Sequence, residues 1–579
     1  MPTTVLLDST SSKKRPANER NLTLLEPAVG YATRDCVFLA LIMFVSSVFY
    51  VSRLGFYWDD WQVLKIFRFS EDQSIIGLTR SVFQAWPEML VRPMQALQWA
   101  ALYPLFGLNP LGYHLVSTAV LAAGVCAFYL VLRAFTGRRL ISLGAAVVFG
   151  MLPHYSTDRF WYAIWAANFG MLFYFLSLYG DLKQLETGRS WIWPWKVIGS
   201  VCLILGSLAY ELFMPLFLLN PVLIALKRLR LKAAGKTVHW GWIGSALFYS
   251  ANPILLVLIA IFKRRMSTRT PTSGEFGWWL VDNTLDSSVD LTFRAYGFDL
   301  PHILSAVWTR YWNWTSFIIA LTLALVVAAY LTQAARLSRE QPPRAAVLGL
   351  IVVAATLLSG MSYAYLYSFY LVNTGVNNRV ALAAAVTIAI AWVSLASLVS
   401  LAVFRRTVAA NYAFCVIVAA LCGYGSLLNN TVSSFWIAAS QRQVQVLKEM
   451  KQHFPSPPPN SSILLGGLCA WTGPGIVFEA RWDLTGALAL TYGDNSLKGE
   501  PMWPWLTVTE DGIPSGPDTS HKTVVYPFTS LYLYDVQNKE ALRITDAKTA
   551  LHYIAKSSQF NEQHNGCLTA GFGTGLPIW

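Results

Sequence analysis

Two adjacent carboxylates stand in an aromatic segment directly after the first apolar run of the chain. Asp59 and Asp60 belong to residues 55–61, with the sequence GFYWDDW. Neighbouring carboxylates at a membrane surface repel each other and lose hydration, which raises the pKa of one of them and favours sharing a proton, a cation or a substrate hydroxyl. The pair therefore predicts a general base. An Asp before an apolar-periodic run is also typical of a helix cap, so one residue could cap while the other reacts.

Two arginines are candidates for binding a phosphate group. Arg92 precedes Pro93 and the apolar run 94–106, whose spacing suits a helix in the membrane interface. Arg379 ends the polar stretch 373–379 that opens a late apolar run. The planar guanidinium can donate two hydrogen bonds to one phosphate. Either arginine could instead only anchor its helix at the lipid headgroups.

Further polar residues lie between or near the ends of apolar runs. Glu211 follows Tyr210 between two short apolar runs, where an unpaired acid costs roughly 2.5–3.5 kcal/mol, so a functional role is expected. A simple turn between two helices is the alternative. His114 either binds substrate or is packed and satisfied. Asp158 and Arg159 could form a surface ion pair of little energetic weight.

The composition is that of a membrane protein. Of 579 residues, 55% are hydrophobic and 13% are charged, whereas soluble proteins carry about a quarter charged residues. The 23 Trp and 26 Tyr suit membrane interfaces. The net charge of +13 would need a contiguous basic face to bind nucleic acid. The basic residues form clusters between apolar runs instead, which excludes a nucleic-acid partner and predicts cytoplasmic loops.

The apolar runs predict an all-α polytopic bundle of about 11 transmembrane helices over residues 35–429. Residues 1–34 lack the apolar core of a signal peptide and are expected to form a disordered cytoplasmic tail. The run 36–54 is the first span. Later runs long enough to contribute spans are 111–132, 140–153 with 163–180, 196–210 with 211–226, 243–262, 315–335, 345–367, 380–404 and 408–428.

Alternate loops hold the basic clusters, which predicts a cytoplasmic N-terminus. These clusters are at 138–139, 183–196, 227–236, 336–344 and 405–406. The first loop, 55–110, is then extracytoplasmic, as is everything after about residue 429. Asp59, Asp60, Arg92, Glu211 and Arg379 fall on this same side. The cluster Lys263–Arg264–Arg265 is the exception, because it falls on the wrong side.

The C-terminal region changes character after the last span. Residues 430–460 predict a helix over 436–453 and a proline-rich linker, and residues 461–579 predict a small extracytoplasmic α/β domain. Strands are expected at 462–465, 475–478, 524–526 and 531–534, with a helix at 546–557. Cys469 and Cys567 could form a disulfide in an oxidising compartment.

Taken in order, these elements resemble the membrane-embedded C-type (GT-C) glycosyltransferases that use polyprenyl-phosphate sugars. They are most similar to bacterial relatives of the tetratricopeptide-type O-mannosyltransferases. The resemblance covers about residues 35–400 and rests on the Asp pair, Arg92–Pro93, 107–114, 149–161, Tyr210–Glu211 and Arg379. The chain departs from the family in two ways. Ala209–Tyr210 precede Glu211 where relatives often carry Ser–Lys, and the tetratricopeptide repeats are absent.

The resemblance implies a helical bundle with a cavity at its extracytoplasmic face and a first-loop carboxylate as the general base. We favour Asp60 as the base, with Asp59 as its helper or helix cap. Arg379 and Arg92 would hold the lipid phosphate, with Glu211 and His114 as further substrate-binding candidates. A divalent cation at Asp59 and Asp60 is an open alternative, although hard cations usually gather more oxygen ligands.

The implied reaction moves a sugar from a polyprenyl phosphate to a glycan, lipid or protein acceptor, with inversion, at the bacterial inner membrane. No glycine loop for a nucleotide occurs in the cytoplasmic loops. A transporter or flippase for a lipid-linked sugar is one rival, which would need charged or broken helices near the bilayer midplane. A non-catalytic assembly subunit is another, and it predicts that Asp59→Asn and Asp60→Asn leave function intact.

Overall fold

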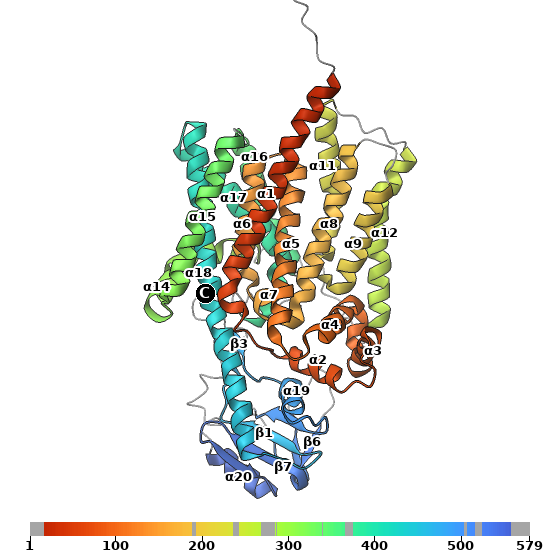
Figure 1. Ribbon diagram of the computed structural model, residues 1–579, viewed down its shortest axis with the longest axis vertical. Helices are drawn as coiled ribbons and strands as arrows, with labels where there is room; N and C mark the ends of the chain where they lie inside the picture. The colour runs from red at the N-terminus through yellow and green to blue at the C-terminus, as the bar shows by residue number, and fades with distance from the viewer. Residues whose placement is uncertain are drawn as a thin grey trace, which may run out of the picture.

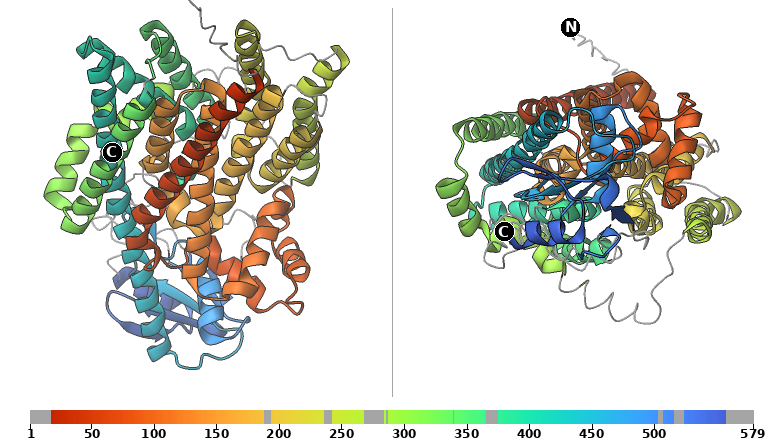
Figure 2. Two further views of the ribbon diagram at one scale, coloured as in Figure 1. Left: turned by 45° about the horizontal axis from the view of Figure 1, so that its top comes forward. Right: turned by 90° about the horizontal axis from the view of Figure 1, so that it is seen from below.

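The computed structural model describes residues 17–187, 193–235, 242–267, 284, 287–338, 340–364, 375–502, 507–515 and 524–556. Long helices form a bundle, and a smaller unit of strands and helices lies at one end of it (Figure 1). This arrangement confirms a mostly helical chain with a small C-terminal α/β unit. Seen from below, the strands of that unit lie across the end of the bundle (Figure 2).

The bundle consists of long helices with short elements between them. The long helices are α1 (Ala17–Val51), α5 (Pro110–Thr136), α6 (Arg139–Met151), α8 (Trp165–Thr187), α9 (Trp193–Ala209), α11 (Asn220–Ala233), α12 (Trp242–Met266), α15 (Trp314–Ser338), α16 (Ala345–Ala364), α17 (Leu382–Val403) and α18 (Thr407–His453). The short elements are α2 (Asp59–Arg68), α3 (Ile75–Ala85), η1 (Pro87–Val91), α4 (Pro93–Phe106), η2 (Pro153–Tyr155), α7 (Thr157–Phe160), η3 (Tyr162–Ile164), η4 (Glu211–Phe213), α10 (Met214–Phe217), η5 (Arg294–Phe298), α14 (Leu300–Arg310) and η6 (Val376–Ala381).

Eight helical segments of the described chain are long and apolar enough to cross a membrane. They are Tyr31–Val51, Pro110–Thr136, Tyr162–Glu186, Glu211–Ala233, Gly244–Met266, Trp314–Leu337, Asn378–Val403 and Thr407–His453. Three further apolar helices are shorter: Arg139–Met151, Pro194–Ala209 and Ala345–Gly360. The predicted count of about 11 is reached only if all three shorter helices also span. The segments support an integral membrane protein.

Small residues let neighbouring helices of the bundle approach closely. On α8 and α9, a Cβ added to Gly180 would lie 2.9 Å from the Trp195 carbonyl oxygen, and one added to Gly199 would lie 3.1 Å from that of Ser177. Lipid tails are as apolar as the helices, so close van der Waals packing of this kind drives association inside a membrane. These two glycines therefore set the spacing between α8 and α9.

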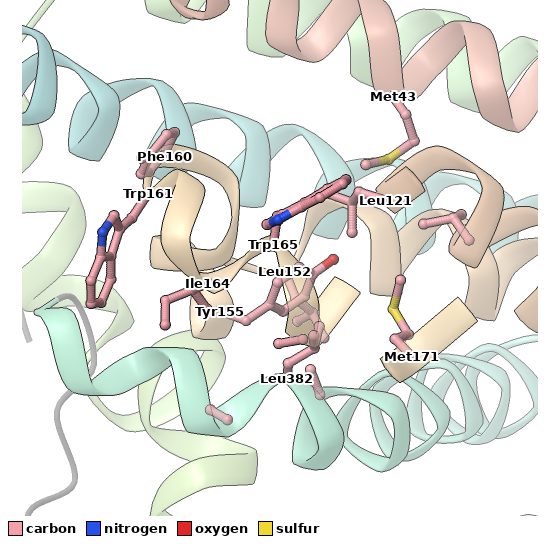
Figure 3. Packing of buried hydrophobic residues seen from close by; sticks show 14 of the residues in the cluster. Met43, Leu121, Leu152, Tyr155, Phe160, Trp161, Ile164, Trp165, Met171 and Leu382 are labelled. Atoms are coloured by element: carbon pink, nitrogen blue, oxygen red, sulfur yellow. The ribbon is translucent and has the colours of Figure 1, made fainter. Parts of the chain in front are cut away.

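Large apolar side chains fill the centre of the bundle beside the first-loop end. Figure 3 shows Met43 from α1, Leu121 from α5, Trp165 from α8 and Leu382 from α17 in one cluster with Tyr155. In a soluble protein, burial of such side chains contributes about 25 cal/mol per Å² of apolar surface. In this bundle, the packed side chains exclude lipid and water from the helix ends that lead to the loops. The cluster gives the loop residues 152–164 a rigid support.

A buried ion pair joins four helices at the opposite end of the bundle. Asp35 of α1 accepts from Arg139 of α6, with Nη2–Oδ1 at 2.6 Å and Nε–Oδ2 at 2.8 Å. Tyr330 of α15 donates to Oδ1 at 2.8 Å, and Tyr129 of α5 donates to Oδ2. Asp35 is 0% exposed and Arg139 is 3% exposed. Because both charges are out of water, each depends on the other partners for stabilisation.

Helix α18 connects the bundle to the C-terminal unit without a break. The sequence predicts a span ending near 428 and a separate helix over 436–453, but both belong to the one helix Thr407–His453. Two polar residues between them donate hydrogen bonds inside the bundle. Asn429 donates to the Met151 carbonyl oxygen at 2.9 Å, and Asn430 donates to the Ser426 carbonyl oxygen at 2.9 Å. At 1.5 Å per residue, α18 is about 70 Å long.

The C-terminal unit is built on a four-stranded sheet with the order β4 (Lys498–Pro501), β1 (Ser462–Gly466), β7 (Leu531–Asp535) and β8 (Glu540–Arg543). β1 runs parallel to β4 and β7, with Leu464 opposite Glu500 and Leu533, and β8 is antiparallel to β7. Two small hairpins, β2 (Trp471–Thr472) with β3 (Gly475–Ile476) and β5 (Gly512–Pro514) with β6 (Val525–Pro527), flank it. The helices are α19 (Arg481–Tyr492) and α20 (Ala547–Lys556), with the short η7 (Phe528–Ser530).

The structure agrees with the sequence on β1, β7 and α20, and the strands predicted at 475–478 and 524–526 overlap β3 and β6, but it adds elements that the sequence does not predict. Helix α19 links the parallel strands β1 and β4, as a parallel pair requires a crossover. At the N-terminus, α1 begins at Ala17, inside the segment predicted as a disordered tail, because Ala17, Glu19 and Arg20 have high intrinsic helix propensity. Residues 1–16 lie outside the described chain. Cys469 forms a disulfide, whereas Cys567 lies outside the described residues.

The substitution Asp35→Asn is expected to destabilise the bundle by about 3–5 kcal/mol, because it leaves Arg139 buried without a countercharge. Thermal unfolding of the detergent-solubilised protein measures this as a lower Tm. The double variant Asp35→Leu with Arg139→Met should recover most of the loss. Lys183→Gln, which removes a partly exposed pair with Glu186, serves as the control and should cost less than about 1 kcal/mol. An Asp35→Asn variant with the same Tm as the parent would show that the Asp35–Arg139 ion pair does not stabilise the bundle.

Candidate active site

The carboxylate pair opens α2, where the chain leaves α1. Trp58 precedes the helix in a left-handed backbone conformation with φ of 47°. A bulky residue in this region costs about 1–3 kcal/mol and is held there only by its surroundings. The Trp58 ring lies between Trp161, at 5.2 Å between centroids, and Trp482, at 6.0 Å. Packing against both rings therefore fixes the start of α2.

Asp60 is a structural link between two segments that are far apart in the sequence. It is 1% exposed, and both of its oxygens accept backbone N–H groups: Oδ2 from Tyr57 at 2.9 Å and Oδ1 from Ala163 at 2.8 Å. Trp161 Nε1 donates to the Tyr57 carbonyl oxygen at 3.1 Å. Burial raises the pKa of Asp60 well above its usual range, and the two backbone donors oppose that shift. The side chain is inaccessible to a substrate.

Asp59 is the accessible member of the pair. It is half-buried, and its Oδ1 accepts a hydrogen bond of 3.0 Å from Trp482 Nε1 on α19. Burial raises the pKa of Asp59 to about 6, while Arg379, the Trp482 donor and Arg92 act to lower it. A carboxyl group with this pKa is ionised at neutral pH and is a stronger base than an ordinary aspartate. The structure thus favours Asp59 over Asp60, the residue favoured from the sequence, as the reacting group.

Helix α19 reaches the first loop by packing closely against the start of α2. A Cβ added to Gly486 would lie 2.5 Å from the Trp61 carbonyl oxygen, so only glycine permits this approach. Asp483 fixes the first turn of α19 by accepting from the backbone N–H groups of Glu479, at 2.8 Å, and Ala480, at 3.2 Å. The C-terminal unit therefore places Trp482 and Glu479 at the site.

Glu479 is a second carboxylate beside Asp59 that the sequence reasoning missed. Its Oε2 is buried and accepts no hydrogen bond from the described residues. Burial and then the charge of Asp59 raise the pKa of Glu479 to about 7, against the attraction of Arg379. Two interacting acids titrate as a pair, with Asp59 losing its proton first. The signal in the sequence was the segment 479–483, EARWD, which combines acids with Trp as the first loop does.

The positive charge of Arg379 acts on both carboxyl groups, Asp59 and Glu479. Arg379 lies on η6 just before α17, and its Nη1 donates to the Val376 carbonyl oxygen at 2.9 Å. Its guanidinium lies 5.6 Å from the centre of the Trp161 ring. Its charge lowers the pKa of both Asp59 and Glu479. The predicted phosphate ligand is therefore placed beside the predicted base.

Arg92 and Glu211 meet in a charge cluster that also contains Lys263. Arg92 donates from Nε to both Glu211 oxygens, at 3.1 and 3.0 Å, and from Nη2 to Oε1. Lys263 Nζ lies 3.0 Å from Oε2, and the Arg92 guanidinium lies 4.1 Å from the Tyr210 ring centre. Two cations share one carboxylate, so the cluster keeps a net charge of +1. Lys263 is the first residue of the basic cluster that broke the loop pattern, and this contact accounts for it.

The histidine and the remaining acidic candidate are packed inside the protein. His114 is 1% exposed, and its Nε2 lies 2.9 Å from the Gly55 carbonyl oxygen, so it supports the first loop from α5. The expected surface pair of Asp158 and Arg159 is wrong, because both residues are buried and Arg159 donates to Tyr155 Oη at 3.0 Å. Residues 152–164 are buried under the first loop, which keeps Asp158 and Arg159 away from water.

The described residues contain no group of three or more His, Cys, Asp and Glu side chains that could hold a metal ion. A cation at the Asp59–Asp60 pair would compete with the two backbone N–H groups that already occupy Asp60.

No protein-family model matches the chain, and no curated protein matches it. Among solved structures, the chain is similar to a crystal structure of ArnT from Cupriavidus metallidurans bound to undecaprenyl phosphate. The sequence identity is 12% and the TM-score is 0.32, over 81% of this chain and 85% of that chain. A TM-score this low does not establish a shared fold.

The two aspartates are expected to differ in their effect on stability. Asp60→Asn turns an amide NH₂ toward a backbone N–H group and should cost about 1–3 kcal/mol in unfolding free energy. Asp59→Asn keeps an oxygen for Trp482 and removes a charge whose ionisation is disfavoured in the folded state. Because the folded-state pKa of Asp59 is raised, its ionisation lowers stability as pH rises from about 4 to about 6. Thermal unfolding at pH 7.5 should therefore leave Asp59→Asn at least as stable as the parent, and equal losses in both variants would contradict these roles.

Proposed function

We propose that this chain is an integral membrane glycosyltransferase of the GT-C type, which moves a sugar from a polyprenyl phosphate to an acceptor hydroxyl. The observation that carries the proposal is the accessible carboxylate of Asp59, with a pKa raised to about 6, beside Arg379. The order of motifs in the sequence supports the same class. Eight helical segments of the described chain are long and apolar enough to cross a membrane, so in this proposal a lipid-linked donor reaches the site from the bilayer.

In the proposed reaction, Asp59 accepts the proton of the acceptor hydroxyl. The freed oxygen forms a bond to the anomeric carbon of the sugar from the side opposite the phosphate. The bond between that carbon and the phosphate oxygen breaks, and its electron pair leaves with the polyprenyl phosphate. The configuration of the sugar is inverted, and the proton on Asp59 returns to water. A general base contributes typically 10²–10⁴-fold to such a step.

The cations act on the leaving group. The departing phosphate gains negative charge as the bond to the sugar breaks, and positive groups placed in advance stabilise that charge. Arg379 stands beside Asp59, and the Arg92–Glu211–Lys263 cluster adds a net charge of +1. In this proposal Glu211 does not bind substrate. It holds Arg92 and Lys263 together against their mutual repulsion.

The remaining residues position the base. Asp60 ties the first loop to residues 161–163, and Trp482 fixes one oxygen of Asp59. Between pH 6 and 7, Glu479 keeps its proton while Asp59 is ionised, so the pair carries one negative charge there. We propose that the acceptor lies between the first loop and α19, on the extracytoplasmic side. Glycans, glycolipids and proteins of the cell envelope remain candidate acceptors.

The flippase reading finds less support in the described bundle. A transport pathway would place charged groups or broken helices near the bilayer midplane. In the buried pairs Asp35–Arg139 and Asp181–Lys196, the two cations lie in the first turns of α6 and α9, and Asp35 lies near the start of the apolar segment Tyr31–Val51. Asp59 and Glu211 lie on the short elements α2 and η4, which join long helices of the bundle. This distribution favours a reaction at one face.

The variant Asp59→Asn is expected to lower turnover by at least 100-fold with a polyprenyl-phosphate sugar, because it removes the proton acceptor. The measurement is transfer by the purified protein to a panel of hydroxyl acceptors. In the parent, kcat should rise with pH through a midpoint near 6, where Asp59 ionises. Trp482→Phe removes a donor that lowers this pKa, so it should move the midpoint upward.

Glu71→Gln is the matched control for Asp59→Asn, because Glu71 is an exposed carboxylate of the same loop. It should leave turnover and the pH profile unchanged. Undiminished transfer by Asp59→Asn would exclude Asp59 as the base. No transfer by the parent with any polyprenyl-phosphate sugar would favour the flippase or the assembly-subunit reading.

Lys263→Gln is expected to raise the KM for the polyprenyl-phosphate donor about tenfold, since one charge-assisted contact to phosphate is worth about 1.5 kcal/mol or more. Arg265→Gln removes the same charge from an exposed position two residues away and should leave KM within about twofold. Steady-state kinetics at fixed acceptor concentration measure both. Equal changes in KM would show that Lys263 acts only through the overall field of the basic cluster.

A further inference from the structure

A cavity lies at the opposite end of the bundle from the candidate active site. Its volume is about 510 Å³, within the range of ligand-binding pockets. Side chains of α5, α6, α11, α16 and α17 line it, and these helices converge at the upper end of the bundle in Figure 1. Its apolar walls include Leu132, Ile141, Val347, Ile351, Ile390 and Val393. Walls of this kind are suited to contact with hydrocarbon chains.

Three arginines line the same cavity at the ends of helices. Arg138 lies between α5 and α6, Arg230 lies near the end of α11, and Arg344 precedes α16. Arg138 donates to the Gln341 carbonyl oxygen, and Arg230 lies 4.8 Å from the centre of the Phe135 ring. Because these partners are uncharged, they do not neutralise the positive charges of Arg138 and Arg230.

No Asp or Glu occurs among the described residues that line the cavity. The neighbouring Glu340 is used elsewhere. It pairs with Arg133 at 3.3 Å and accepts from the backbone N–H groups of Arg139, at 2.7 Å, and Leu140, at 3.2 Å. The cavity therefore combines a charge of about +3 with apolar walls, and it needs an anionic partner that is itself amphipathic.

We infer that this cavity binds an anionic phospholipid of the surrounding bilayer, with its phosphate on the arginines and its acyl chains along the apolar walls. Basic pockets between transmembrane helices are typical sites for lipid headgroups. The helices beside the cavity present apolar side chains outward, with Leu229 of α11 at 63% exposed and Leu350 of α16 at 70% exposed. A lipid can therefore enter sideways from the membrane. A headgroup with two phosphates complements three arginines best.

The site is independent of the proposed glycosyl transfer. It lies at the far end of α5 from the first loop, because the first residue of this helix, Pro110, is near that loop and the last residue, Thr136, lines the cavity. A lipid there bridges α11, α16 and the α5–α6 link. Binding of a ligand to the folded state alone stabilises that state, so the lipid would raise the thermal stability of the bundle.

Native mass spectrometry of the full-length protein in a neutral detergent tests the inference. Cardiolipin, phosphatidylglycerol and phosphatidylcholine are each titrated, and the two anionic lipids should bind at least tenfold more tightly than phosphatidylcholine. The double variant Arg230→Gln with Arg344→Gln should lower the affinity for cardiolipin about 30-fold. Val347→Trp, a large side chain at a wall position that is 44% exposed, should block binding with all arginines present.

Arg405→Gln with Arg406→Gln is the matched control, because it removes two exposed arginines from the loop between α17 and α18. It should leave the affinity within about twofold. Equal losses in the two double variants, or unchanged binding by Val347→Trp, would show a diffuse surface attraction and overturn the site. Competition of cardiolipin by inorganic phosphate at equal concentration would overturn the phospholipid as occupant. A parent-like melting temperature of each variant in lipid-free detergent excludes misfolding.

Discussion

The carboxylate of Asp60 joins the first loop to the segment before α8. Its two oxygens accept the backbone N–H groups of Tyr57 and Ala163, which stand on either side of the Trp161–Tyr57 hydrogen bond. Successive residues of a helix point about 100° apart. Once Asp60 points inward to these donors, Asp59 must point elsewhere, and the direction available is toward α19. One buried acid therefore makes its neighbour accessible.

This constraint extends to the C-terminal unit. Asp59 reaches Trp482, and Trp482 stacks near Trp58, which itself rests against Trp161. The row of rings holds Trp58 in its strained backbone conformation. Gly486 lets α19 come close enough to complete the row. The C-terminal unit is thus part of the site, although it is joined to the bundle only through α18 in the sequence.

The sequence was sufficient for the class of fold, and it also supplied the candidate residues, because both depend on local signals. Apolar runs of membrane length, alternating basic clusters and an Asp pair between aromatic residues can all be read within short windows. The different roles of Asp59 and Asp60 cannot be read within a short window of sequence. Whether Asp59 or Asp60 is buried depends on Ala163 and Trp482, which lie about 100 and 420 residues away. No periodicity in the first loop carries that information.

Glu479 and Lys263 were missed for related reasons. A proline-rich linker normally marks a boundary between independent units, so the segment 479–483 was assigned to a separate domain. Lys263 was read as an exception to a topology rule, because that rule treats every cation as a signal for the cytoplasmic side. The contact with Glu211 gives the lysine a different reason to be present. A charge that violates a topology pattern is more informative than one that follows it.

The cluster around Glu211 also explains how two cations, Arg92 and Lys263, can lie close together at the proposed phosphate site. Arg92 and Lys263 would repel each other strongly in a site of low dielectric if no anion stood between them. Glu211 accepts from both and reduces their combined charge from +2 to +1. The remaining charge of +1 would still attract the phosphate of the proposed donor, but the unliganded protein does not have to hold two unpaired cations out of water. In the proposed reaction, the same cations would face a more negative group once the phosphate leaves the sugar, so their attraction would grow along the reaction, which is the condition for lowering its barrier.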